Sequence, residues 1–167
     1  DRAKVQTEIT DLQNQLKATA SSAVFNGENW LDVNSDATAY NATRAVVASF
    51  SRADDVVTID KIDIDIRKFH LFDASTTGTG LFDKAVADLD ISSSTVHLTS
   101  RTGAEPDGAT TTGVSIYGFD ISGVTNSEDD LNALEKLTAG VDKILNELTD
   151  SISYLGSIKN RVDIQKD

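Results

Sequence analysis

Residues 127–165 read SEDDLNALEKLTAGVDKILNELTDSISYLGSIKNRVDIQ. Apolar residues recur in this stretch every seven positions, and further apolar residues follow three or four positions after them. Such spacing places one apolar stripe along a single α-helix. The seven-residue row consists of Leu134, Val141, Leu148, Leu155 and Val162. The pattern predicts a helix roughly 57 Å long, at about 1.5 Å per residue. It fits a supercoiled helix and an ordinary long bundle helix equally well.

The residues at the two ends of this stretch predict where the helix starts and stops. Ser127 is a suitable N-cap, and three acidic residues follow it in the first turn, where the helix dipole favours negative charge. Basic residues gather near the other end, where positive charge is favoured. We therefore expect one unbroken helix from Glu128 to Gln165.

The first 24 residues predict a second amphipathic helix. Apolar residues recur there at spacings of four and three, which places them on one helical face. This row consists of Val5, Ile9, Leu12, Leu16 and Ala20. We expect its first four members to pack against the row of the long helix in one bundle. The sequence leaves open the relative direction of the two helices.

A turn is predicted directly after the first helix, at Phe25, Asn26 and Gly27. Glycine accepts the left-handed backbone conformation that ends helices and closes tight turns. We expect a hairpin at this position.

Residues 26–126 are rich in Thr, Ser, Gly and Asp, and their apolar residues alternate, which is typical of strands. Val57 and Ile59 are out of phase with the later isoleucines of the same strand, so we expect a bulge near Lys61. The expected strands are 44–50, 56–66, 95–100 and 114–121, with a short helix at 81–89 and a loop at 102–113.

These elements predict an α+β fold. The two terminal segments form a long-helix bundle, and a β-rich module is inserted between them. The expected domains are a discontinuous helical core, residues 1–43 and 127–167, and a variable outer domain, residues 44–126.

The composition excludes several classes of function. The 167 residues carry a formal net charge of −12, which argues against nucleic acid and anionic membranes as partners. Cysteine is absent, and the two histidines fall in predicted strands. Residues 32–36 begin like a calcium loop but lack its glycine and glutamate, and residues 78–83 lack the third glycine of a dinucleotide loop. We expect no cofactor, no bound metal and no enzymatic activity.

Two stretches resemble bacterial flagellins. The first runs from DRAKVQTEIT at residues 1–10 to Phe25, Asn26 and Gly27, and resembles their conserved helix-to-hairpin segment. The second resembles their returning helix. It includes Leu155, Gly156, Asn160 and Arg161. The middle looks closest to the short-insert flagellins of soil and plant-associated bacteria.

The resemblance implies a subunit of the extracellular flagellar filament, secreted through the flagellar channel and self-assembling for motility. The resemblance implies that the helical core corresponds to the flagellin domain called D1, and that the insert corresponds to the outer domain called D2. Other flagellin subunits are the implied partners; an export chaperone and a host innate immune receptor are further candidates. Because flagellins carry further terminal segments, we expect the 167-residue chain alone to be a soluble monomer with weak receptor activity.

Two alternatives accompany this interpretation. The first is the hook-filament junction protein of the same export system, which shares terminal helices of this kind. The second, from another class, is a carbohydrate-binding surface protein or hydrolase. That function would use Trp30, Tyr40 and Tyr117.

Overall fold

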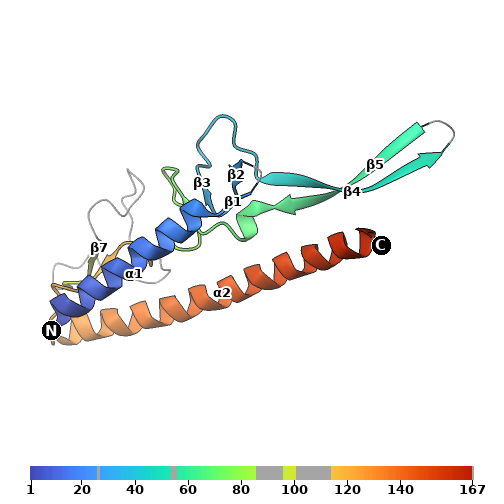
Figure 1. The fold of residues 1–167 in the computed structure, drawn as a ribbon. Coiled ribbons are helices and arrows are strands. Elements are labelled where there is room, and N and C mark those ends of the chain that lie inside the picture. The colour runs from blue at the N-terminus through green and yellow to red at the C-terminus, as the bar shows by residue number, and fades with distance from the viewer. Residues whose placement is uncertain (26, 54–55, 86–95, 101–113, 167) are drawn as a thin grey trace.

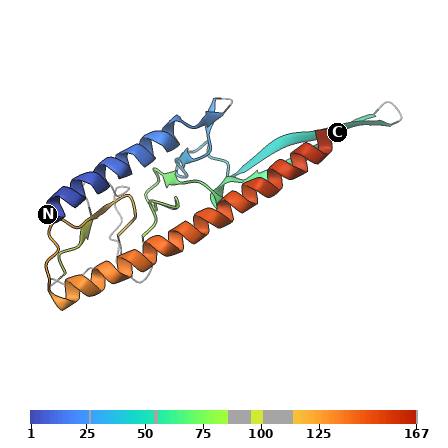
Figure 2. The same cartoon turned by 60° about the horizontal axis from the view of Figure 1, so that its bottom comes forward.

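A computed structural model describes residues 1–25, 27–53, 56–85, 96–100 and 114–166. Two long helices, α1 (Arg2–Ser22) and α2 (Glu128–Lys166), run in the same direction, with short strands and turns between and beside them (Figures 1 and 2). Within the described residues, the strands form four two-stranded sheets. Their bounds are β1 Val24–Phe25, β2 Glu28–Asn29, β3 Asp32–Val33, β4 Thr43–Ala53, β5 Val56–Asp65, β6 Phe72–Asp73, β7 Thr99–Ser100 and β8 Phe119–Asp120. The α+β class is confirmed.

The long helix is present over the predicted residues. The Ser127 hydroxyl accepts a hydrogen bond from the Asp130 amide at 3.2 Å, which confirms the predicted N-cap. Five buried positions of α2 repeat every seven residues, in a register three residues after the predicted row. They are Asp130, Leu137, Ile144, Ser151 and Ile158. The predicted row flanks them and is half-buried.

The predicted inner face of α1 is wrong except at Ala20, which is buried as expected. Val5, Leu12 and Leu16 are 46%, 59% and 42% exposed, and Ile9 is half-buried. The buried residues of α1 are Gln6, Gln13 and Ala20. The reason is that residues 116–121 present backbone amides and carbonyls to α1, and glutamine side chains satisfy these groups where leucine could not. The two apolar rows therefore do not meet.

Three clusters of buried residues follow α2 from its start to its end. The first joins Leu98, Val114 and Val124 to Ala133 and Leu137 of α2. The central cluster is Ala20, Phe72, Leu81, Phe82 and Ile144. The last is Val33, Ile62, Ile64, Ile66, Phe69 and Ile158. Each consists largely of residues from the connecting segments, which pack on the inner face of α2.

The expected hairpin follows α1. Strands β1 and β2 pair antiparallel, and Gly27 adopts a φ of 82°, the left-handed conformation that glycine accepts without strain.

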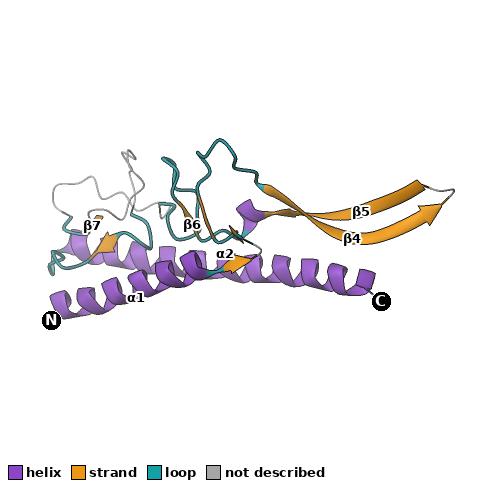
Figure 3. Cartoon of the chain, turned by 45° about the horizontal axis from the view of Figure 1, so that its top comes forward, coloured by secondary structure: helices purple, strands orange, loops and turns teal. Residues whose placement is uncertain are grey.

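The predicted strand pair is present as a long antiparallel ribbon of β4 and β5, which extends past the end of α2 (Figures 1 and 3). The register shifts between Val47 and Ser49, opposite Lys61 and Asp60, so the bulge lies at the predicted level but on β4. Near α2 the inner residues Ile62 and Ile64 are buried, whereas farther out Val57 and Ile59 are exposed.

Other local predictions are wrong. Residues 81–85 form a turn rather than the start of a helix. The Lys84 amide donates to the Gly80 carbonyl as in one helical turn, but Ala85 then pairs with Ser115 in a β-bridge, which ends the turn. The strands predicted at 95–100 and 114–121 shorten to β7 and β8 within the described residues, and neither histidine lies in a strand. The predicted loop at 102–113 lies outside the described residues. The division into core and outer domains stays a prediction.

Candidate functional site

The outer face of α1 is an apolar stripe formed by Val5, Leu12 and Leu16. Leu12 and Leu16, with Gln15 and Thr19, line a shallow hollow of about 390 Å³. Leucine side chains exposed in this spacing on one helix face form a continuous patch rather than scattered surface residues. The stripe is suited to packing against another apolar surface.

A second apolar stripe lies on the outer side of α2. Leu131, Leu145 and Ile152 are exposed, and their spacings of fourteen and seven residues place them on one face. Leu145 is 53% exposed, although the next residue toward the N-terminus, Ile144, is 3% exposed. The long helix therefore has one apolar face toward its own chain and another toward solvent.

Asp73 is a buried carboxylate that joins two connecting segments. Its Oδ1 accepts hydrogen bonds from the Ser35 amide at 2.9 Å and the Ser75 amide at 3.1 Å. Its Oδ2 accepts from the Ser35 hydroxyl at 2.7 Å and the Thr79 hydroxyl at 2.6 Å. Burial raises the pKa of Asp73, but these hydrogen bonds outweigh it and hold the pKa well below its usual range. Asp73 acts as a structural anchor.

Asp130 plays a similar part at the start of α2. It accepts hydrogen bonds from the hydroxyl and amide of Thr125 and from the backbone and ring of His97. The Thr125 hydroxyl lowers its pKa most; burial opposes this, and the His97 and Thr125 amides add to the lowering. This carboxylate fixes residues 97 and 125 to the first turn of the helix.

Asp83 is a third buried carboxyl, and its pKa is raised, unlike those of Asp73 and Asp130. Burial raises its pKa to about 6, although Asp83 Oδ2 accepts the Asp73 amide at 2.6 Å and Lys17 lies near enough to oppose the rise. The folded state therefore binds the proton more tightly than the unfolded chain. The resulting stability is present below about pH 4 and is lost as the pH rises through about 6.

We expect Asp83→Asn to stabilise the chain at pH 8. The amide keeps an acceptor for the Asp73 amide and carries no charge to bury, so the gain should be about 1–3 kcal/mol, and it should vanish near pH 4. Urea unfolding at both pH values measures the difference. A variant that is less stable than the parent at pH 8 would contradict the assignment of Asp83 as a destabilising buried charge.

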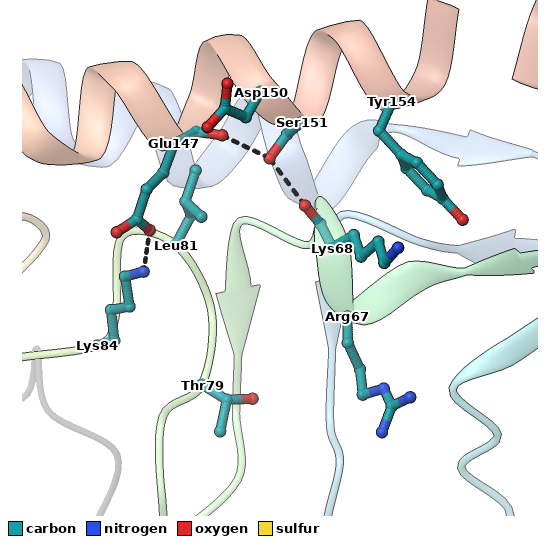
Figure 4. Close-up of a pocket in the computed structure, with 9 residues that line it drawn as sticks. All are labelled: Arg67, Lys68, Thr79, Leu81, Lys84, Glu147, Asp150, Ser151 and Tyr154. Carbon is teal, nitrogen blue, oxygen red and sulfur yellow. Dashed lines mark hydrogen bonds and ion pairs between the residues drawn. The ribbon is translucent and has the colours of Figure 1, made fainter. Parts of the chain in front are cut away.

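A pocket of about 410 Å³ lies between α2 and the turns at residues 67–84 (Figure 4). Its cations are largely engaged within the chain: Lys84 pairs with Glu147, Arg67 with Asp65, and Lys68 lies 4.7 Å from the centre of the Tyr154 ring. The Ser151 hydroxyl donates to the Lys68 carbonyl at 2.8 Å. These contacts fasten the turns to α2 and leave little charge for a ligand.

Within the described part of the chain, no three His, Cys, Asp or Glu residues come together as a metal site. No helix there is long and apolar enough to cross a membrane.

Comparison with curated proteins finds flagellins along the whole chain. Flagellin C of Rhizobium meliloti (strain 1021) is 35% identical over 173 residues, which cover 99% of this chain and 50% of that protein. The chain is flagellin-like. Flagellin A and Flagellin B of Rhizobium meliloti are 25% and 26% identical, and each match covers the whole chain and 60% of the relative. The chain thus spans half to three-fifths of the length of these relatives. No protein-family model matches it.

The residues that carried the flagellin resemblance lie at two places in this flagellin-like chain. Phe25 is in β1 and Gly27 is in the hairpin turn; Asn26 lies outside the described residues. On α2, Leu155 packs against the last core cluster, whereas the other three motif residues are exposed. These three are Gly156, Asn160 and Arg161.

The sequence patterns did not predict several buried residues that stabilise the fold of this flagellin-like chain. Gln6 and Gln13 precede the predicted position Ala20 at seven-residue spacings, as core positions do, and this repeat was the available signal. Asp73 and Asp83 gave no comparable signal, since Asp73 joins nearby Ser75 and Thr79 to Ser35, 38 residues away, and Asp83 accepts a backbone amide.

Proposed function

We propose that this chain is part of a structural subunit of the bacterial flagellar filament, exported from the cell and assembled for motility. The observation that carries the proposal is the pair of exposed apolar stripes on α1 and α2 of a chain that matches flagellins from end to end. In a chain of net charge −12, exposed apolar side chains offer contacts through which like-charged copies can approach. The D1-like and D2-like arrangement is part of the same proposal.

The carbohydrate-binding alternative gains no support from the three aromatic residues it would use. Trp30 and Tyr40 pack against the last core cluster, and Tyr117 packs edge-on against Phe72 with ring centres 5.3 Å apart. The junction-protein alternative is likewise not favoured, because the relatives are named flagellins. An export chaperone and an innate immune receptor stay predicted partners.

The test introduces one acidic residue into each apolar stripe. The substitutions are made in the parent protein, the proposed filament subunit of which this chain is part, and are studied in the bacterium that encodes it. We expect Leu12→Asp and Leu145→Asp each to shorten or abolish filaments and to reduce swimming, because a carboxylate would be buried between chains. Electron microscopy gives filament length, and the amount of protein in the medium separates export from assembly.

The matched controls are Ala18→Asp on α1 and Asn146→Asp on α2, which add the same charge at exposed positions off the stripes. They should leave filaments unchanged. Thermal melting of each 167-residue variant should stay close to that of the parent chain, which rules out misfolding. Normal filaments in both stripe variants would refute the proposal.

A further inference from the structure

Helix α1 is attached to the body by polar contacts rather than by a packed apolar face. Of its buried residues, only Ala20 belongs to a core cluster of the described residues, and it lies near the end of the helix. The other two are Gln6 and Gln13, and the leucines of the helix face solvent. Elements with few buried apolar contacts open at lower free energy than the rest of a protein.

The N-terminal part of α1 is held by two glutamine contacts and, at the exposed surface, by the Arg2 guanidinium, which donates to Asn126 Oδ1. Gln6 Oε1 accepts the Ile121 amide at 2.9 Å, and Gln13 Nε2 donates to the Ile116 carbonyl at 2.9 Å and, at 3.4 Å, to that of Phe119. Gln13 is 3% exposed, and its Oε1 has no hydrogen-bond partner in the described structure. A buried acceptor without a partner carries a desolvation cost that offsets the gain from the bonds.

The other end of α1 is fastened more firmly. Asn29 Nδ2 donates to the Ala20 carbonyl at 2.7 Å and the Ser21 carbonyl at 3.0 Å. Lys17 forms an ion pair with Asp32 at 2.8 Å, and Ala20 is packed in the central cluster. The attachment therefore changes from polar to packed between Gln13 and Ala20.

We infer that residues 2–16 of α1 undock from the body as one unit, hinged near Ala20, while the three core clusters stay folded. The two glutamine contacts and the Arg2–Asn126 hydrogen bond break together, which frees the Ile121 amide. This inference does not depend on the proposed filament function.

Native-state hydrogen exchange of the 167-residue chain, followed by NMR at low denaturant, tests the inference. We expect the Ile121 amide and the amides of residues 6–16 to share one opening, at least about 100-fold more populated than the opening that exposes Ile144. An undocked α1 would not keep its amides protected, because isolated helices of this length are marginal in water. Equal protection and equal denaturant dependence at Ile121 and Ile144 would overturn the inference.

The variant Gln13→Ala provides a second test, with exposed Gln15→Ala as the matched control. We expect Gln13→Ala to lower protection of the Ile121 amide at least about fivefold, although Gln13 makes no bond to that amide, and to leave Ile144 within about twofold. Gln15→Ala should change neither. Two results would each contradict undocking as a unit: an equal loss of amide protection at Ile121 and Ile144, or no loss of protection at Ile121.

Discussion

The substitution Ile144→Asp should abolish cooperative folding of the chain. Ile144 is 3% exposed and packs in the central cluster with Phe72, Leu81 and Phe82. An unpaired carboxylate in this cluster costs several kcal/mol, which is comparable with the whole stability of a domain. We expect thermal melting followed by circular dichroism to show no sharp transition.

The neighbouring substitution Leu145→Asp is the control. It adds the same charge one residue along the same helix, but Leu145 faces solvent. Its melting temperature should stay within about 3 °C of the parent, a shift that corresponds to about 1 kcal/mol for a chain of this size. Similar melting of the two variants would show that the inner and outer faces of α2 are assigned wrongly.

The substitution Asp73→Ala should lower the free energy of unfolding by about 4 kcal/mol. It removes the acceptor of four hydrogen bonds, of which the one from the Ser75 amide is buried and those from Ser35 and Thr79 are partly buried. Urea unfolding at pH 7 measures the loss. Because the pKa of Asp73 is lowered in the fold, this stability is present above about pH 4, and the difference from the parent should shrink as the pH falls toward the folded pKa.

Asp36→Ala is the matched control for Asp73→Ala. Asp36 joins nearby parts of the same two segments by accepting hydrogen bonds from the amide and hydroxyl of Thr76, but at the exposed surface. We expect it to cost about 1 kcal/mol or less, since water replaces the lost acceptor. Equal losses in the two variants would contradict burial as the source of the effect.

The long helix could be predicted from sequence because its signals are local. The seven-residue repeat, the Ser127 cap and the acidic first turn all lie within the helix itself, and each is present in the structure. The turn at Gly27 was predictable for the same reason, since its backbone conformation favours glycine.

The inner face of α1 could not be predicted because it depends on what the helix meets. Helix periodicity identifies an apolar face and does not say whether that face lies toward the same chain. Here residues 116–121 meet α1 with backbone polar groups, so glutamines are buried and leucines are exposed. The same exposure makes the apolar row a candidate surface for packing between chains.

The middle of the chain was predicted least well because distant contacts determine it. The turn at residues 81–85 has apolar spacing that suits a helix, but Ala85 pairs with the distant Ser115 in a β-bridge. Asp73 and Asp130 are fixed by partners up to 38 residues away, which no local pattern reveals.

The most direct test is a cryo-electron microscopy map of filaments grown by the parent protein, at a resolution that shows side chains. We predict that α1 and α2 keep the fold described above and that Leu12, Leu16, Leu145 and Ile152 are covered by neighbouring helices. A filament in which these four side chains face solvent, or a parent protein that forms no filament, would contradict the assignment of the two stripes as assembly surfaces.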